Sequence, residues 1–198
     1  MIAQLWGAVL AAGGTWVVID VGGLGLRVLC TPGTAGQVRP GEPTVLHTTL
    51  IVREDSLTLY GFSTADERDC FELVQSATGV GPKLALAVVS VLNPDDLRQA
   101  IAAGNLGALT RVPGIGPKVA QRLVLELKDK VGKLAVLADR AGATPTGWRD
   151  QVASGLEGLG WSRRDAEAAC DRVADLAESE PAPGVAVLMR AALRSMAK

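Results

Sequence analysis

Two copies of one short stretch, TGVGPK at Thr78–Lys83 and PGIGPK at Pro113–Lys118, organise this sequence. Their first glycines, Gly79 and Gly114, lie 35 positions apart, and apolar residues at helical spacing flank each copy. The glycines permit a tight turn, because a residue without a Cβ does not clash at positive φ. The proline that follows suits a first helical position, where its missing N–H would have no partner within the helix. Each copy is therefore predicted to be a turn between two helices.

Each of these turns also has the features of a phosphate-binding site. Free backbone N–H groups, the N-terminus of a helix and a lysine side chain all attract phosphate. Glycine and proline could serve backbone geometry alone, but the shared Pro-Lys ending of the two copies favours phosphate binding. Two such sites in one chain indicate a ligand with repeated phosphates, which is a nucleic acid. The candidate DNA-binding residues are Gly79, Val80, Gly81, Lys83, Gly114, Ile115, Gly116 and Lys118.

The residues of each candidate site have different expected roles. The turn presents backbone N–H groups to phosphate oxygens, and Lys83 and Lys118 add positive charge. Val80 and Ile115 are expected to pack inward as anchors. Contacts to phosphates carry no information about the bases, so binding should be independent of sequence and should weaken as salt concentration rises.

Composition describes an ordinary folded protein and limits how it can bind DNA. Of the 198 residues, 48% are hydrophobic and 21% are charged, and the formal net charge is −1. Any DNA binding must therefore come from local patches of charge. No apolar run reaches the roughly 18 residues that a membrane helix needs. A signal peptide begins with a basic segment, whereas the first basic residue here is Arg27, so a signal peptide is not expected. A cytoplasmic location is expected, with the three scattered cysteines as reduced thiols.

The pattern of apolar residues divides the chain into four segments, which together predict an α+β multidomain protein. Residues 1–63 are predicted to form a small closed barrel, of which the OB fold is one common type, because five short strands follow one another. Residues 64–134 show helical periodicity around both glycine turns and are predicted to form an all-α tandem helix-hairpin-helix domain. Residues 135–147 lack strong periodicity and are predicted to be a flexible linker. Residues 148–198 are predicted to form a three-helix module.

The expected elements have the following bounds. The strands are Ile2–Leu10, Thr15–Val21, Gly25–Cys30, Thr44–Arg53 and Leu57–Phe62, with a loop at Thr31–Pro43. The C-terminal helices are Trp148–Leu159, Ser162–Leu176 and Pro183–Met196. Six apolar residues of this last module could form its core or a groove for a partner, and the core is favoured for most of them: Leu156, Leu159, Trp161, Val185, Leu188 and Met189.

Few residues outside the glycine turns suggest chemistry. Glu54 and Asp55 occupy the turn between the last two expected strands, where a solvated turn is the simplest interpretation. A metal-dependent nuclease would need more carboxylates nearby, and a third alternative is that this pair repels phosphates and steers DNA strands. His47 has no partner at catalytic or metal-binding spacing. No P-loop motif occurs, so the chain is not expected to hydrolyse ATP. No cofactor or metal is expected either.

The order and spacing of several motifs resemble the RuvA family, the bacterial Holliday-junction-binding subunits of the branch migration complex. The resemblance extends over essentially the full length, although the C-terminal third matches mainly in size and helix pattern. The motifs that carry it are Val52–Ser56 (VREDS), Leu59–Phe62 (LYGF), Gly79–Ala85 (GVGPKLA), Leu109–Gly116 (LTRVPGIG), Ala120, Arg122-Leu123 and Glu126–Lys130 (ELKDK).

The resemblance implies a function that the residues alone do not define. It implies a homotetramer, or an octamer of two stacked tetramers, that holds four-way junction DNA open and nearly square. Glu54 and Asp55 match the family's acidic pin at the crossover, which repels phosphates and guides strands. The third domain is implied to bind the hexameric AAA+ motor RuvB, which supplies ATP hydrolysis. RuvC resolvase is an implied further partner, in recombination, DNA repair and the SOS response.

Two positions depart from the family's pattern, and two other functions compete with this one. Leu26 stands where the family often has tyrosine, and Pro117 stands where it often has lysine, which removes one possible phosphate contact. One competing function is a general duplex-binding scaffold. The other is a repair glycosylase or nuclease that uses Lys118 or the pair Glu54 and Asp55.

Overall fold

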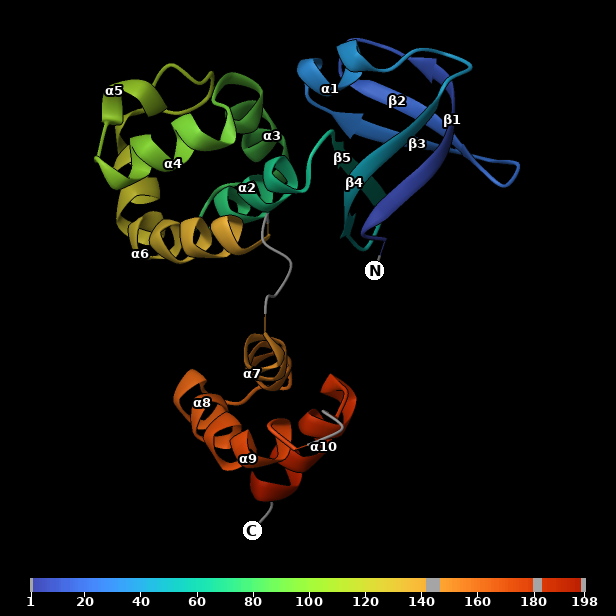
Figure 1. Ribbon diagram of the computed structural model, residues 1–198. Helices are drawn as coiled ribbons and strands as arrows, with labels where there is room; N and C mark the ends of the chain where they lie inside the picture. The colour runs from blue at the N-terminus through green and yellow to red at the C-terminus, as the bar shows by residue number, and fades with distance from the viewer. Residues whose placement is uncertain (1, 142–146, 180–182, 197–198) are drawn as a thin grey trace. The chain divides into compact units, whose positions relative to one another are not determined.

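The computed structural model describes residues 2–141, 147–179 and 183–196 of the chain (Figure 1). The chain divides into two compact units, Met1–Val136 and Leu137–Lys198. The first unit contains a β-barrel followed by helices, and the described part of the second unit is helical.

Five strands form the closed barrel at the start of the first unit. They are β1 (Gln4–Ala12), β2 (Trp16–Val21), β3 (Leu24–Cys30), β4 (Pro43–Val52) and β5 (Leu57–Phe62). The strand order is β1-β2-β3-β5-β4, and β4 pairs back to β1. Neighbouring strands are antiparallel except β3 and β5, which are parallel. The predicted five-stranded barrel of the OB-fold type is confirmed.

A short helix, α1 (Pro32–Gln37), lies in the segment Thr31–Pro43 that was expected to be a loop. Its N-terminus is capped by Thr31, whose Oγ1 accepts a hydrogen bond of 3.1 Å from the N–H of Thr34. The expectation was wrong here because this helix contains two glycines and a proline, which have poor helix propensity. The cap and the barrel packing of the buried Ala35 outweigh that propensity.

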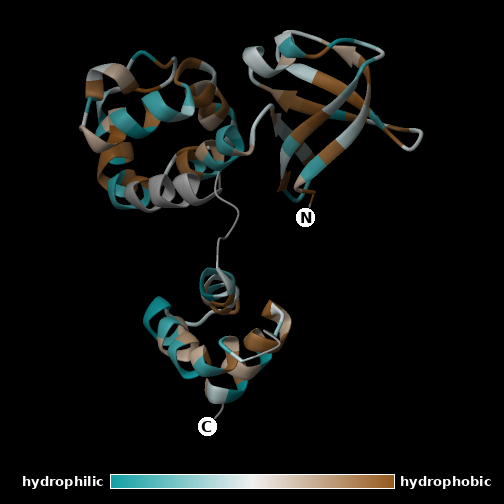
Figure 2. Ribbon diagram, in the orientation of Figure 1, coloured by the Kyte–Doolittle hydropathy of each residue, from teal (hydrophilic) through white to brown (hydrophobic). Residues whose placement is uncertain are grey.

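Alternating burial along the strands forms the barrel core. In β2, Val17 and Ile19 are fully buried while the residues between them are half-buried, as expected when successive side chains point to opposite faces. Hydrophobic residues, drawn in brown in Figure 2, occur along the barrel strands. Gly7 lies so close to β2 that an added Cβ would be 1.8 Å from the carbonyl oxygen of Asp20. Only glycine fits at this position.

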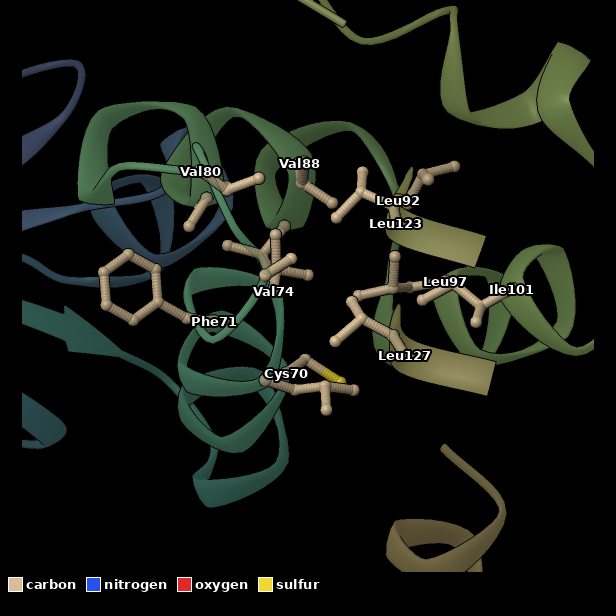
Figure 3. Close-up of a cluster of buried hydrophobic side chains, with 14 of the residues drawn as sticks. Cys70, Phe71, Val74, Val80, Val88, Leu92, Leu97, Ile101, Leu123 and Leu127 are labelled. Atoms are coloured by element: carbon tan, nitrogen blue, oxygen red, sulfur yellow. The ribbon is translucent and has the colours of Figure 1, made fainter. Parts of the chain in front are cut away.

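Five helices follow the barrel: α2 (Ala65–Gln75), α3 (Pro82–Val91), α4 (Pro94–Ala102), α5 (Leu106–Leu109) and α6 (Pro117–Ala141). Side chains of Thr64, Asn93 and Asn105 cap α2, α4 and α5 by accepting a backbone hydrogen bond three residues on. The helices pack their apolar faces around one core, which includes Leu97 and Leu123 (Figure 3). The predicted tandem helix-hairpin-helix region is confirmed.

The barrel and these helices share part of that core. Tyr60 and Phe62 of β5 belong to the helical core cluster, and both rings pack on Phe71 of α2, at centroid distances of 5.0 and 5.1 Å. A hydrogen bond of 2.5 Å runs from Thr49 Oγ1 in β4 to Glu72 Oε1 in α2. Strands β4 and β5 are therefore fixed against α2 within the first unit.

An ion-pair network joins two of the helices. The Arg98 guanidinium in α4 binds Asp66 of α2 at 2.6 Å and Asp95 at 2.8 Å. The hydrogen bond to Asp66 is the main reason that the pKa of Arg98 is raised above its usual range. The three cysteines, which were expected to be reduced thiols, are unpaired, and all three are buried. Burial raises the pKa of the Cys30 thiol to about 11 and that of the Cys70 thiol to about 12.

Helix α6 extends through residues 135–141, which belong to the segment 135–147 that was predicted to be a flexible linker. The remaining part of that segment, apart from Gly147, lies outside the described residues. The local sequence KLAVLADRA contains good helix formers, so a helix that is already nucleated at Pro117 can propagate through it. The first seven positions of the predicted linker are therefore helical.

The second unit contains four helices in its described residues: α7 (Trp148–Gly158), α8 (Arg163–Arg172), α9 (Ala174–Ala177) and α10 (Val185–Met196). The helix predicted at Ser162–Leu176 is divided at Val173, which ends α8 and precedes the short α9. Ser162 caps α8, because its Oγ accepts a hydrogen bond of 3.2 Å from the N–H of Asp165. The other two helices agree with the prediction within two residues at each end.

No helix in the described ranges 2–141, 147–179 and 183–196 is both long and apolar enough to cross a membrane.

Candidate nucleic-acid interface

The first glycine turn connects α2 to α3 and has a well-defined backbone. Gly79 has a φ of +81°, where a residue with a Cβ would be strained. The N–H of Val80 closes the turn by donating to the carbonyl oxygen of Ala77 at 3.1 Å, and the Val80 side chain is buried in the core (Figure 3). Gly81 then caps α3, and Lys83 in the first turn of that helix is exposed.

The second turn repeats this geometry 35 positions later, between α5 and α6. Gly114 has a φ of +90°, and the N–H of Ile115 donates to the carbonyl oxygen of Val112 at 3.0 Å. The Ile115 side chain is buried and Lys118 is exposed. The two turns are thus equivalent in backbone, anchor and cation. Hereafter they are called hairpin 1 (residues 76–83) and hairpin 2 (residues 111–118).

The structure changes one expectation about the glycines and confirms another about the anchors. Only the first glycine of each pair has positive φ, since Gly81 has a φ of −84° and Gly116 is also outside that region. An added Cβ at Gly81 or Gly116 would meet no atom within 4 Å, so the space above both is open to a ligand. The inward packing of Val80 and Ile115 is confirmed.

The backbone N–H groups of the glycines are the available donors of each hairpin. Those of Val80 and Ile115 already bond within the turn, whereas those of Gly79, Gly81, Gly114 and Gly116 have no protein acceptor in the described part of the chain. Each hairpin therefore offers two glycine N–H groups, the N-terminus of a helix and one lysine, which is a suitable arrangement for a phosphate. Lys83 and Lys118 form no ion pair with any described residue.

Three side chains of α6 hold hairpin 1, and they were missed by the sequence analysis. Glu126 Oε2 accepts a hydrogen bond of 2.8 Å from the N–H of Thr78, and Arg122 donates one of 3.2 Å to the carbonyl oxygen of the same residue. Lys130 donates to Ser76 Oγ at 3.0 Å. Residues 122, 126 and 130 are spaced by four and lie on one face of the helix. The spacing of these three residues can be recognised in the sequence and indicates a shared polar face of the helix. It does not indicate which turn that face contacts.

The two hairpins are linked in both directions. Helix α6, which begins at hairpin 2, binds hairpin 1 through Arg122 and Glu126. Conversely, an added Cβ at Gly114 of hairpin 2 would lie 3.2 Å from Leu84 Cδ1 in α3, the helix that begins at hairpin 1. The two phosphate-binding candidates are therefore fixed relative to each other within one compact unit.

The predicted acidic turn connects β4 to β5. The N–H of Arg53 donates to the carbonyl oxygen of Ser56 at 2.9 Å, so the residues between them, Glu54 and Asp55, lie at the tip of a tight hairpin. Both carboxylates are on exposed residues, and Asp55 accepts a hydrogen bond of 3.2 Å from Ser56 Oγ. The cross-strand pair Val52 and Leu57 flanks the tip and is also exposed.

The other residues considered for catalysis or metal binding do not form a site in the described part of the structure. His47 lies in β4 opposite Gln4 on one side and Phe62 on the other, with neither a carboxylate nor a thiol as its cross-strand neighbour. Across the described residues, no three His, Cys, Asp or Glu side chains are grouped so that they could hold a metal ion.

The second unit divides its six candidate residues between core and surface. Leu156 and Leu188 are buried in its core, and Val185 and Met189 are packed against that core. Leu159 and Trp161 are instead 62% and 43% exposed. Four of the six residues therefore belong to the core, as was expected for most of them, and the other two are exposed.

The first unit thus defines a class of protein in which an OB-fold barrel is joined to tandem helix-hairpin-helix motifs. The three family matches agree with this order. Residues 1–61 match the RuvA N-terminal domain, residues 71–129 match the SAM-like helix-hairpin-helix tandem, and residues 147–197 match the RuvA C-terminal domain.

Relatives similar over their whole length identify the family. The chain is 56% identical to a protein from Cutibacterium acnes and 55% identical to one from Thermobifida fusca, with 100% of both chains covered in each case. It is 51% identical to a protein from Streptomyces coelicolor, over 99% of this chain and 98% of the relative. Each relative is named a Holliday junction branch migration complex subunit RuvA. The chain belongs to the RuvA family.

Proposed function

We propose that this protein is the DNA-binding subunit of a Holliday junction branch migration complex. It binds four-way junctions without regard to sequence and holds them in an open, nearly square form. The observation that carries this proposal is the pair of equivalent hairpins, fixed relative to each other in the unit that also carries the acidic turn. The names of the relatives support the choice of a four-way junction over other nucleic acids.

In this proposal each hairpin holds the phosphate backbone of a duplex arm. The glycine N–H groups donate to phosphate oxygens, while Lys83 and Lys118 neutralise charge. Val80 and Ile115 act indirectly, because their buried side chains fix the turn that aims those N–H groups. Such contacts do not depend on the identity of the bases. DNA of any sequence can therefore move through the protein while the same kind of contact is kept.

The acidic turn has the opposite role at the crossover. Glu54 and Asp55 repel phosphates and so keep the strands apart where they exchange partners. Their exposed position at the tip of a tight hairpin supports this role. The two carboxylates are not buried in the protein, so they can remain charged and come close to DNA. The contrast in charge between the hairpins and this tip would orient the junction on the protein.

The proposal can be tested by measuring junction affinity over a range of salt concentrations. Lys83→Ala and Lys118→Ala should each weaken binding to a labelled four-way junction. Each should also reduce the salt slope by about one per lost phosphate contact. Arg164→Ala, in the second unit, removes the same charge as a control and should leave both quantities unchanged. If the salt slope stayed the same in both lysine variants, the proposal that the hairpins contact DNA phosphates would be wrong.

We further propose that the protein does not itself cleave DNA, and the same labelled junction tests this. The competing function is a glycosylase or nuclease that uses Lys118 or the acidic turn. Incubation of the protein alone with the junction, with and without Mg²⁺, should leave every strand intact. Strand cleavage that is lost in Lys118→Ala or in Glu54→Gln with Asp55→Asn would establish the enzyme instead.

We also propose that the protein acts in the cytoplasm as a homotetramer or octamer, with RuvB and RuvC as partners. The second unit would bind the RuvB motor, and its exposed Leu159 and Trp161 support a role in contacting a partner. A chain that ends at Ala141 should still bind junctions but should not stimulate the ATPase of the motor. Stimulation equal to that by the full chain would contradict this assignment of the second unit.

A further inference from the structure

A cavity of about 400 Å³ lies within the first unit, between the β4–β5 hairpin and the start of α3. Its lining includes Arg53, Ser56, Thr58 and Tyr60 from the barrel, and Lys83 from hairpin 1. The cavity therefore connects the strand ends that carry the acidic turn with one of the two phosphate-binding candidates. Arg53 is not among the candidate DNA-binding residues derived from the glycine turns.

Strand geometry explains why Arg53 faces this cavity. Successive side chains of a strand point to opposite faces, so Thr49 and Ile51 share one face of β4, and Arg53, the first residue after the strand, follows in the same alternation. Thr49 on that face donates to Glu72 of α2, and its cross-strand partner Tyr60 packs on Phe71. The face is therefore the one that packs against the helices. Val52, on the other face, is 64% exposed.

The lining is positively charged and rich in groups that can donate hydrogen bonds. Arg53 and Lys83 form no ion pair within the described residues, and no carboxylate is among the described residues that line the cavity. Ser56 and Thr58 add hydroxyl groups to the same lining. Burial raises the pKa of Tyr60, and the positive charge of Arg53 partly offsets this rise. Two cations and several donors suit an anion with several oxygens.

We propose that this cavity binds a phosphate group of the DNA strand that passes the acidic turn, with Arg53 as a further DNA-binding residue opposite Lys83. The inference rests on the proposed function, because that function makes DNA the source of the phosphate. The attraction at Arg53 and the repulsion at Glu54 and Asp55 act at consecutive positions of the chain. A strand would be held on one side of the turn and pushed away on the other, which fixes the place where it bends.

The test measures junction affinity and its salt slope for Arg53→Gln, with Arg39→Gln as the matched control. Arg39 is also an exposed arginine of the barrel region, and it is not part of the cavity. Arg53→Gln should bind the junction about tenfold more weakly and with a salt slope lower by about one per lost contact. Arg53→Lys, which keeps the charge, should recover part of the affinity, and Arg39→Gln should match the wild type.

A second arm distinguishes DNA phosphate from free phosphate. Inorganic phosphate at millimolar concentration is added to the full-length wild type and to Arg53→Gln, and the Tm of each is measured. A phosphate-dependent rise in Tm in the wild type alone, together with unchanged junction binding in Arg53→Gln, would show a site for free phosphate and overturn the inference. Unchanged affinity and salt slope in Arg53→Gln without such a rise would overturn it too. Failure of the wild type to bind junctions would instead overturn the proposed function.

Discussion

At the scale of single residues, hairpin 1 depends on contacts that join distant parts of the chain. Thr78 has both of its backbone polar groups bonded to α6, the N–H to Glu126 and the carbonyl oxygen to Arg122. The carboxylate is an acidic group beside a proposed phosphate site, where its charge alone would weaken DNA binding. Its hydrogen bond to the backbone gives it a positioning role, which we expect to outweigh the effect of its charge.

Substitution of Glu126 separates these two effects. Glu126→Ala leaves the Thr78 N–H without its acceptor, so we expect about threefold to tenfold weaker junction binding, equivalent to about 1 kcal/mol. Glu126→Gln keeps an acceptor and removes the charge, so it should bind at least as tightly as the wild type. Asp129→Ala, which removes a carboxylate from an exposed position of the same helix, is the control. If Glu126→Ala bound more tightly than the wild type, repulsion would be the main effect and the positioning role would be wrong.

The residues of the two hairpins could be predicted from sequence, but their supports could not. Glycine and proline determine the turn locally, and the buried anchors follow from the apolar residue between the glycines. The contacts of Glu126 and Arg122 span 48 and 44 positions. They depend on how α6 packs against α2 and α3, which no local pattern contains. Arg53 was missed for the same reason, because its cavity requires the strand and α3 to be adjacent.

At the scale of elements, local sequence predicted type better than extent. The five strands were predicted because alternation and turns are local signals. Helix α1 was missed because its glycines have low helix propensity, although its N-terminus is well capped. Helix α6 continues beyond the predicted domain end, since residues 135–141 have good helix propensity and follow a long established helix. The break between α8 and α9 at Val173 has no proline or glycine to mark it.

The coupling between elements is the structural feature that connects the acidic turn to the hairpins. Strands β4 and β5 are joined to α2 by the Thr49–Glu72 hydrogen bond and by the packing of Tyr60 and Phe62 on Phe71. Helix α2 leads directly into hairpin 1. The acidic turn therefore has a fixed position relative to hairpin 1, as a role in guiding strands at a junction requires.

At the scale of the whole molecule, function depends on where charge is placed and not on its total. The chain has a formal net charge of −1, so a general attraction to DNA is not expected. The proposed contacts combine two equivalent basic hairpins, a basic cavity and an acidic tip within one compact unit. Such a pattern favours DNA in which several duplex arms meet around a point, and a single straight duplex can satisfy only part of it.

The most direct test of this account is a competition between a four-way junction and a linear duplex of the same arm sequence. Wild-type protein is held at fixed salt with labelled junction, and unlabelled junction or duplex is added. The account predicts that junction displaces the label at a concentration at least about tenfold lower than duplex, a difference of about 1.4 kcal/mol in binding free energy. Equal displacement by the two competitors would contradict it.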